Sequence, residues 1–565
     1  MGAEQVRAAE GSDEAPADGY LPPEELPAAA PAEPPHIPLP GWKVFLYYIC
    51  ALLFALTQGL GMNLAFANLT QIQGSIAATT TEAAWLSAAY MAPNVSLAIG
   101  LVKIRMQYGL RNFAEVSIIG FLVASMLNLF VSDLQSAIVV RFLSGIAAAP
   151  LSTLAFLYIL EAMPPEKKMT VGVSLAMMNT TLAAPVTRLV SPTLLDYGQW
   201  RGLYTLEMAL ALLVVPIIYL LPLTPPPRMK VIAPADVGAY LLIAIGFGCL
   251  AVVLSLGRLD WWLEAPWLGV VLSVAIVSIT SAMLIELNRK TPLIDVRWLL
   301  TWPNLHLTGV LLVFRLIVAT QSYVIMSYYQ GVAGLLYDQL STLYWIILIF
   351  SLAGGLSCAA LMNRGYTWQI HTAALVMMAA SAFMDSSMTN LTRPEQMYVS
   401  QALMAAGAAF FLPPSMAEGL KAASAKGPHY LVTFFVIFLF TQSIGGLIGS
   451  AFFGTLIIIR EKFHSNALVE HVLMQDPNVA QRVTQYAATY GKVIGDSAIL
   501  KAEGLAMLGA RITREANVLA YADAFYVAGV IALLALAGQL LHLAVIAARS
   551  RFPARADPLA STAEE

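Results

Sequence analysis

The feature that most constrains this chain is a series of long, almost uninterrupted apolar runs. A helix that crosses a bilayer needs about 20 mostly apolar residues. Fourteen stretches meet that need: 43–68, 83–102, 113–132, 137–160, 169–190, 201–221, 236–257, 266–286, 304–326, 339–361, 370–386, 397–417, 430–458 and 523–548. Apolar and polar residues do not alternate in these stretches, as they would over the roughly ten residues of a barrel strand. The stretches therefore predict membrane-spanning helices.

Composition excludes a water-soluble particle. Of 565 residues, 58% are hydrophobic and 12% are charged, against roughly 45–50% and about 25% in soluble domains. Cys50, Cys249 and Cys358 lie inside apolar runs, which excludes a disulfide framework and a cysteine metal cluster. The net charge of -3 gives no footprint for nucleic acid. We therefore expect an all-α polytopic membrane protein with no metal site.

Basic residues beside short loops indicate the orientation of the helices, because they collect on the cytoplasmic side. With the N-terminus inside, seventeen Lys and Arg fall on the inner side, and the short outer loops hold only Arg201, Arg258 and Arg393. This asymmetry predicts that both termini are cytoplasmic, and it requires an even number of spans.

The chain divides into five expected parts. Residues 1–40 are rich in Pro, Ala and acids, with no signal peptide, and predict a disordered cytoplasmic tail. The other parts are a first six-helix bundle (41–222), a linker with two extra helices (223–290), a second six-helix bundle (291–548) and a second cytoplasmic tail (549–565). Within the second bundle, the outer loop 459–522 has helical spacing of apolar residues and predicts two amphipathic helices. They would either cap the bundle or dock a partner.

Six segments carry a family resemblance. In chain order they are LGMNLAFANLTQIQGSI (60–76), GLVKIRMQYGLRNF (100–113), VVRFLSGIAAAPL (139–151), AAPVTRLVSPTLLDYGQWRGLYTLE (183–207), NRKTPLIDVRWL (288–299) and REANVLAYADAF (514–525). Together they resemble the fourteen-helix drug/proton antiporter branch (EmrB/QacA type) of the major facilitator superfamily. The resemblance implies two six-helix bundles with two extra helices between them. It also implies alternating access, with export of amphipathic compounds driven by inward proton flow.

The expected proton-coupling residues are Glu207 and Arg141. An arginine inside the membrane is a functional candidate by default, and in the resembled family this arginine supports proton coupling; the alternative is that Arg141 snorkels to the interface. The family's first-helix Asp aligns with Gly61, which cannot titrate. Glu207 stands seven residues after Trp200, where the family normally has Asn. Burial favours the neutral form of a carboxyl and a nearby arginine favours the charged form, so this group can alternate between them.

Two further arginines fall within apolar runs and predict an anion site. Arg188 replaces a residue of the family's Gly-Pro pair, and Arg315 lies near the middle of its run. Since arginine is well suited to bidentate recognition of carboxylates, we expect a central cavity for an anionic amphipathic substrate. The alternative is an internal salt bridge from either arginine to Glu207. The expected polar lining groups are Asn63, Asn68, Tyr323 and Gln330.

The short inner loop after the second run holds Lys103, Arg105 and Arg111. We expect these residues to act as a latch between packed helices, with topology anchoring as the alternative. The loop lacks the Asp and the first Gly of the resembled family, so the latch must differ in detail.

The sequence contains no P-loop motif, so we expect no ATP and no cofactor. The expected partners are a small-molecule substrate, protons and the lipid bilayer. The resemblance also implies a location in the bacterial inner membrane. It further implies two protein partners, a periplasmic adaptor of the HlyD/EmrA type and an outer-membrane channel. Rival functions are a proton-uncoupled facilitator or importer of an organic anion and, from another class, a polytopic membrane enzyme or sensor.

Overall fold

The computed structural model describes residues 39–221, 223, 232, 234–289 and 292–551, and within these ranges it contains helices and connections but no strand. Residues 1–38 of the expected tail, most of the Pro-rich stretch 222–233 that begins the linker, and residues 552–565 lie outside them. The longer helices are α1 (Gly41–Ala67), α3 (Thr80–Tyr108), α4 (Leu110–Asn128), α5 (Leu134–Ala162), α7 (Val173–Leu220), α8 (Pro234–Leu256), α9 (Pro266–Leu287), α11 (Trp302–Ala319), α13 (Ser341–Met362), α14 (Thr367–Asp385), α15 (Tyr398–Lys426), α16 (Pro428–Glu470), α17 (Pro477–Ala488) and α18 (Ser497–Arg551).

Short elements join the long helices. They are α2 (Leu69–Ser75), α6 (Pro165–Lys167), α10 (Val296–Leu299), α12 (Ile325–Ser327), the π-helical turns η1 (Lys168–Gly172), η2 (Thr320–Val324) and η3 (Tyr328–Val332), and the 3-10 turns η4 (Asp338–Leu340) and η5 (Pro394–Met397). Single π-turns inside α-helices are rare and are frequent at functional sites. Here η2 and η3 both follow α11 and interrupt the helix that carries Arg315.

Ten helices among the described residues are long and apolar enough to cross a membrane. Each of the fourteen expected stretches overlaps a helix, and two of them share α7. The helices α3, α14 and α15 are not among the ten; Ser, Thr and Asn dilute the apolar character of α3 and α14. The all-helical architecture is therefore confirmed, and the number of fourteen spans stays a prediction.

The long helix α7 contains a reversal that matches the boundary between two expected spans. Gly198 and Gln199 have non-helical torsion angles, and Gln199 adopts a φ of 52°. A Cβ on Gly202 would lie 2.3 Å from the carbonyl oxygen of Leu194. The two helical parts therefore approach too closely at this turn for any side chain at residue 202.

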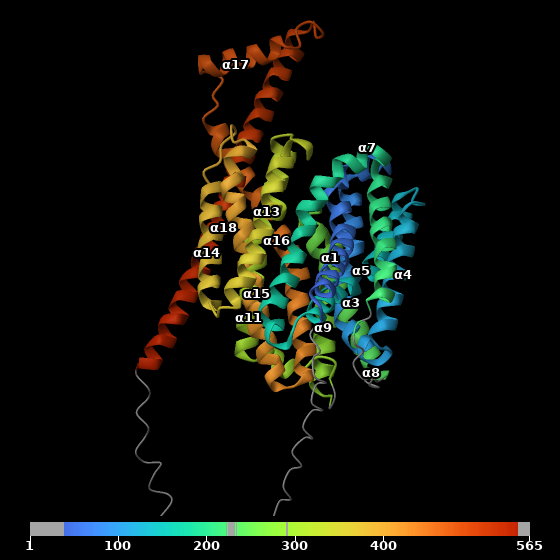
Figure 1. Cartoon of the computed structure of the whole chain (residues 1–565). Helices are drawn as coiled ribbons and strands as arrows, with labels where there is room; N and C mark the ends of the chain where they lie inside the picture. Colours follow the sequence, from blue (N-terminus) through green and yellow to red (C-terminus); the bar gives the residue numbers. More distant parts are fainter. Residues whose placement is uncertain (1–38, 222, 224–231, 233, 290–291, 552–565) are drawn as a thin grey trace, which may run out of the picture. The chain divides into compact units, whose positions relative to one another are not determined.

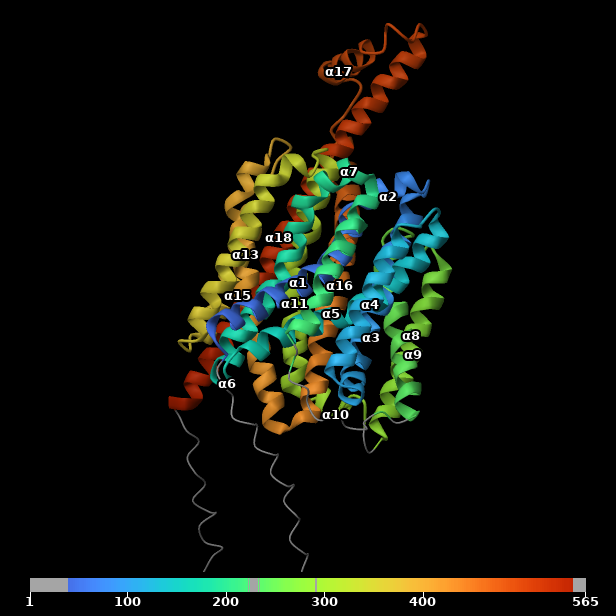
Figure 2. The same cartoon turned by 45° about the vertical axis from the view of Figure 1, so that its right-hand side comes forward.

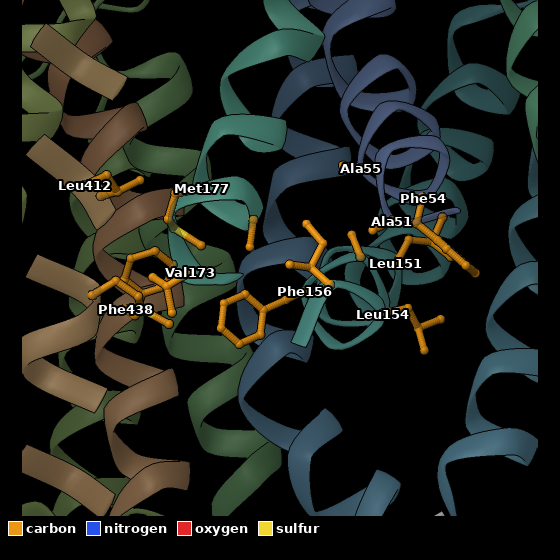
Figure 3. Close-up of a cluster of buried hydrophobic side chains, with 14 of the residues drawn as sticks. Ala51, Phe54, Ala55, Leu151, Leu154, Phe156, Val173, Met177, Leu412 and Phe438 are labelled. Carbon is orange, nitrogen blue, oxygen red and sulfur yellow. The ribbon is translucent and has the colours of Figure 1, made fainter. Parts of the chain in front are cut away.

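Helix packing follows the two halves of the sequence. The helices α1, α3, α4, α5 and α7 pack against one another, as do α11, α13, α14, α15, α16 and α18 (Figures 1 and 2). The two sets meet where α7 packs against α13 and α15 and where α3 packs against α16. The helix α8, outside both sets, packs against α3 and α16. Figure 3 shows buried side chains from both sets in one hydrophobic cluster, including Phe156 of α5, Val173 of α7 and Phe438 of α16.

The loop 459–522 differs from the expectation of two amphipathic helices. Only α17 is a separate helix, and the flanking residues extend α16 to Glu470 and start α18 at Ser497. Nothing between Ile459 and Glu470 breaks a helix, whereas Asp476 caps α17 by accepting a hydrogen bond from the Asn478 amide at 2.8 Å. Figure 1 shows α17 beyond one end of the long helices, which we call the α17 end.

Candidate functional site

A buried group of polar side chains surrounds Glu207. The carboxyl comes from the second part of α7 and is 1% exposed. Arg141 of α5 is also 1% exposed, and it is the charged group next to the carboxyl. The Arg141 guanidinium lies over the Tyr90 ring at 4.3 Å and donates through Nη1 to the Gly61 carbonyl oxygen at 3.2 Å. Buried beside Tyr90, this arginine packs inside the helix bundle.

Unpaired polar atoms remain in this group, which we call the Glu207–Arg141 site. Oε1 of Glu207 and Nε of Arg141 make no hydrogen bond within the described part of the chain. Most buried polar atoms in native proteins are hydrogen-bonded, so each exception asks for an explanation. A carboxyl with a free oxygen, facing a fixed cation, has the chemistry to take up and release a proton.

The two positions that depart from the family pattern meet in space. A Cβ on Gly61 would lie 3.6 Å from Glu207 Oε1 and 3.0 Å from the Phe121 ring. The acid of α7 therefore occupies the place that an acidic side chain on α1 would reach. The signal was present in the sequence as two departures, a Gly for an Asp and a Glu for an Asn, but only the helix packing connects them.

Arg188 lies at the contact between the two sets of helices. Its Nη2 donates to the carbonyl oxygen of Ser322 in η2 at 2.9 Å, and its guanidinium lies 5.2 Å from the Tyr344 ring centroid of α13. Tyr337 lies beside both Arg188 and Gln330, and its hydroxyl donates to the Ala67 carbonyl oxygen at 2.7 Å. The structure thus brings Arg188 and Gln330 together beside Tyr337.

Arg315 packs against a glycine-rich stretch of α16. A Cβ on Gly446 would lie 2.7 Å from Arg315 Nη2, and a Cβ on Gly445 would lie 2.9 Å from Arg315 Cβ. These glycines make room for the arginine as well as for the helix contact. Its Nε makes no hydrogen bond in the described part, and no ion pair there joins Arg315 or Arg188 to Glu207.

The other expected lining residues contact their own surroundings. Asn63 donates to the Gly59 carbonyl one turn back at 2.7 Å. Asn68 is buried and donates to Ser191 Oγ at 2.8 Å, which ties α1 to α7. Tyr323 lies under the Arg258 guanidinium at 5.2 Å. Asn68 thus serves helix packing, and none of these three contacts Arg188 or Arg315 in the interactions above.

The three expected latch residues separate into different environments. Lys103 is buried and pairs with Asp236 of α8 at 3.0 Å. Asp236 also pairs with Arg289 at 2.6 Å, and Arg289 pairs with Glu286 of α9 at 2.8 Å. Lys103 is therefore fixed to the two extra helices. Sequence reasoning missed its acidic partners, although each lies near the end of a predicted helix.

None of the three residues lies in the expected loop, because Lys103 and Arg105 belong to α3, Arg111 belongs to α4, and only Gly109 separates the two helices. Arg105 and Arg111 are more exposed than Lys103. Arg111 pairs with Glu115 of its own helix at 2.9 Å, and its side chain is 66% exposed. Arg105 is half-buried. A solvent-exposed pair of this kind contributes little to stability, so Lys103 carries the interhelical contact.

The motif REANVLAYADAF also has a structural explanation. Its Asp523 accepts from Arg460 Nε at 2.6 Å and lies 2.6 Å from His464 Nε2. Both partners belong to the extension of α16, so Asp523 fastens α18 to α16.

The family comparison decides the class of protein. A model described as Major Facilitator Superfamily matches residues 48–450. The chain belongs to the major facilitator superfamily. It is therefore a multi-pass membrane protein from a family of secondary transporters, not of enzymes.

The curated relatives of this chain are distant. It is 25% identical over 264 residues to the Multidrug export protein EmrB of Haemophilus influenzae, covering 46% of this chain and 50% of the relative. It is 26% identical to the Fatty acid resistance protein FarB of Neisseria gonorrhoeae, covering 40% and 44%, and 23% identical to the Probable multidrug resistance protein EmrY of Escherichia coli, covering 46% and 50%. The chain spans about half the length of these relatives.

Solved structures confirm the major facilitator fold. The human organic anion transporter MFSD10 (TETRAN) superimposes with a TM-score of 0.51 at 9% identity, covering 87% of this chain and 100% of the other. The proton:xylose symporter XylE gives a TM-score of 0.51 at 13% identity, covering 86% and 95%.

Proposed function

We propose that this transporter exports anionic amphipathic molecules by proton-coupled alternating access, and that it belongs to the fourteen-helix antiporter branch. The two halves, 41–222 and 291–548, would rock against each other about a site near the bilayer midplane. The observation that carries the proposal is the buried Glu207–Arg141 site, where a carboxyl with a free oxygen faces a cation.

Glu207 would load and release the coupling proton. Arg141 would favour the charged form in one state of the transporter, and a change in burial would favour the neutral form in the other. Because Arg141 is fixed by the Gly61 carbonyl and the Tyr90 ring, a shift of α1 against α5 would alter the field at Glu207.

Arg188 and Arg315 would recognise the anionic group of the substrate. Each has an Nε that makes no hydrogen bond within the described part, so each keeps a donor for a ligand. A fatty acid combines a carboxylate with an apolar tail, and the relative named Fatty acid resistance protein FarB agrees with this substrate class. Asn63, Asn68, Tyr323 and Gln330 remain proposed lining groups.

The cellular setting is proposed on the resemblance. The transporter would lie in a bacterial inner membrane with both termini in the cytoplasm. An adaptor of the HlyD/EmrA type and an outer-membrane channel would then act beyond the α17 end.

A second candidate is a proton-uncoupled facilitator or importer of an organic anion. The observation that favours it is Gly61, which removes the titratable side chain of the first helix. Glu207 at the same place in space argues for coupling instead.

The test is proton flux in proteoliposomes, with the wild type and Glu207→Gln and a panel of fatty acid anions and lipophilic cations. We expect anions to drive proton movement in the wild type and Glu207→Gln to abolish it. Arg188→Gln should weaken anion transport, whereas Arg111→Gln, which changes an exposed arginine, should leave it unchanged. Anion transport that ignores a pH gradient would establish the facilitator instead.

A further inference from the structure

A second buried carboxyl, Asp385, lies at the C-terminal end of α14 and has no role in the mechanism above. Its side chain is 3% exposed. Ser400 Oγ donates to Oδ1, and Gln401 Nε2 donates to Oδ2 at 2.7 Å. Both donors are neutral, and no ion pair in the described part involves Asp385. A buried carboxylate without a cation is costly, so such a group tends to bind a proton.

The hydrogen bonds around Asp385 can serve both of its protonation states. In the charged state, Ser400 and Gln401 donate to the two carboxylate oxygens. In the neutral state, the acid proton on Oδ1 would be donated to Ser400 Oγ. The Ser400 hydroxyl would then donate to the Met397 carbonyl oxygen, which lies 3.0 Å away. Rotation of one hydroxyl thus satisfies either state, and no buried polar atom is left unpaired.

A cavity gives protons a route to this carboxyl. A hollow of about 250 Å³ is lined by Asp385 and by polar side chains of the following connection, Ser387, Thr389, Thr392 and Gln396. Asn390 in that connection donates to Glu515 of α18 at 2.8 Å, so the hollow lies towards the extension of α18 that carries α17. Ser387, Thr389 and Gln396 are exposed, so water reaches the mouth of the hollow.

The other ionisable groups of this region surround Tyr329 of η3. Tyr329 lies within electrostatic range of Asp385, Tyr344 of α13 and Glu395 of η5. The neighbouring Tyr328 lies within electrostatic range of Arg514 and Glu515 of α18. The hydroxyl of Tyr329 makes no hydrogen bond in the described part. None of these groups forms an ion pair with Asp385, so proton binding there is governed by burial and by its two neutral donors.

Two amides connect Asp385 to the contact between the halves. Gln401, which donates to Asp385, receives hydrogen bonds from Gln321 Nε2 at its carbonyl oxygen (3.1 Å) and at Oε1 (3.2 Å). Gln321 belongs to η2, and the carbonyl oxygen of the next residue, Ser322, accepts from Arg188. A hydrogen bond to a carboxylate is stronger than one to a neutral acid. Protonation of Asp385 would therefore loosen Gln401 and, through it, the segment that holds Arg188.

We propose that Asp385 is a second proton-binding group of this transporter, loaded from the cavity at the α17 end, and that its charge state controls the Gln401–Gln321–Arg188 contact between the two halves. This inference rests on the proposed proton-coupled transport and adds a second site to it. Glu207 would hold a proton in the first half, and Asp385 would hold one in the second half.

Infrared difference spectroscopy of the full chain in nanodiscs tests the site without transport. Titration with pH should show the carbonyl stretch of a protonated carboxylic acid that disappears in Asp385→Asn. The same band should remain in Glu207→Gln and in Glu395→Gln, which neutralises an exposed acid of η5. Ser400→Ala keeps the carboxyl but removes the hydroxyl that hydrogen-bonds to it, so the pH at which half of the band has disappeared should shift. This variant also provides a test if Asp385→Asn does not fold. An unchanged band in folded Asp385→Asn, or an unshifted midpoint in Ser400→Ala, overturns the proposal.

Proton counting in proteoliposomes tests the link to transport. The number of protons moved per fatty acid anion should fall by one in Asp385→Asn and stay unchanged in Glu395→Gln, which neutralises an exposed acid of η5 outside the lining of the cavity. If Glu207→Gln abolishes coupling and Asp385→Asn leaves the count unchanged, the second site is wrong and the proposed function stands. If the wild type moves no protons, the proposed function fails, and the infrared band still decides whether Asp385 binds one. A response to Na⁺ in place of protons at Asp385 also overturns the proposal.

Discussion

The carboxyl of Glu207 stands against the backbone of Gly61, so that a Cβ on Gly61 would lie 3.6 Å from Glu207 Oε1. An acid supplied by α7 therefore fills the space that an acid on α1 would fill. Arg141 links the two positions, because its guanidinium donates to the Gly61 carbonyl and is the charged neighbour of Glu207. The site keeps one carboxyl beside one arginine, although the helix that supplies the carboxyl has changed.

This relationship predicts a coupling between substitutions at the two positions. Gly61→Asp in the wild type places a second acid beside Glu207 and presses on the Phe121 ring, so it should destabilise the protein. The same substitution in Glu207→Gln should cost less and should restore part of the proton flux. Residues in contact usually couple by about 0.5–3 kcal/mol.

The measurement is a double-mutant cycle on thermal unfolding in detergent, together with proton flux in proteoliposomes. Gly61→Ala is the matched control, since it adds the contact with Phe121 without a charge. Strictly additive effects of the two acidic changes would contradict the shared position.

The buried charge cluster around Asp236 predicts a large stability effect. Asp236→Asn leaves the buried Lys103 and the half-buried Arg289 with less compensating charge, and removal of one partner of a buried pair costs about 3–5 kcal/mol. Thermal unfolding should shift clearly downwards. Arg111→Gln removes an exposed pair within one helix and should cause no measurable shift. Equal effects of the two substitutions would show that Lys103 is not the residue that joins α3 to the extra helices.

Two helix caps predict a dependence of stability on acid pH. The Thr79 amide lowers the pKa of Glu82 below its usual 4.5, and the Ser136 amide lowers the pKa of Asp133 below its usual 3.8. Because these pKa values are lower in the folded state, the stabilisation is present above the ordinary values and is lost as pH falls through the lowered ones.

Substitution at the caps should reduce that dependence. In Glu82→Gln/Asp133→Asn, unfolding temperatures measured from neutral to acid pH should fall less steeply than in the wild type, because neither side chain titrates. Asp133→Ala removes the cap itself and should lower stability at every pH. An identical acid limb in the double variant and the wild type would exclude a contribution from these carboxylates.

The glycines of α16 predict a graded response to added methyl groups. A Cβ on Gly449 would lie 2.6 Å from Ala319 Cβ, which cannot move without its helix, whereas a Cβ on Gly446 meets the flexible end of Arg315. Gly449→Ala should therefore cost about 1–3 kcal/mol, and Gly446→Ala should cost less.

Gly538→Ala in α18 is the control, because its Cβ would meet nothing within 4 Å and Ala favours a helix. It should leave thermal stability unchanged or raise it slightly. A cost at residue 538 equal to that at residue 449 would show that close helix contact is not what the α16 glycines provide.

The sequence alone determined the helical, multi-pass architecture and the superfamily. Hydrophobicity over about 20 residues is a local property, so each apolar run between 43 and 548 coincides with a helix. The reversal of α7 at Gly198 and the start of α17 after Asp476 also depend on short stretches of sequence, a glycine in one case and a capping residue in the other. The helices α16 and α18 extend into the outer loop because no residue there breaks them. The helical spacing of apolar residues is the same for an extended helix and for a separate one, so it could not tell the two apart.

Only the tertiary structure decided which polar residues share a site. Glu207 and Gly61, Lys103 and Asp236, and the chain from Asp385 through Gln401 to Arg188 each join residues on different helices. The surroundings of a buried charge come from helix packing, which joins residues 16 apart in sequence, such as Asp385 and Gln401, as well as residues 133 apart, such as Lys103 and Asp236. Patterns along the chain identified Glu207 and Lys103 as unusual, and they gave no sign of Asp385, because its partners are neutral residues on another helix.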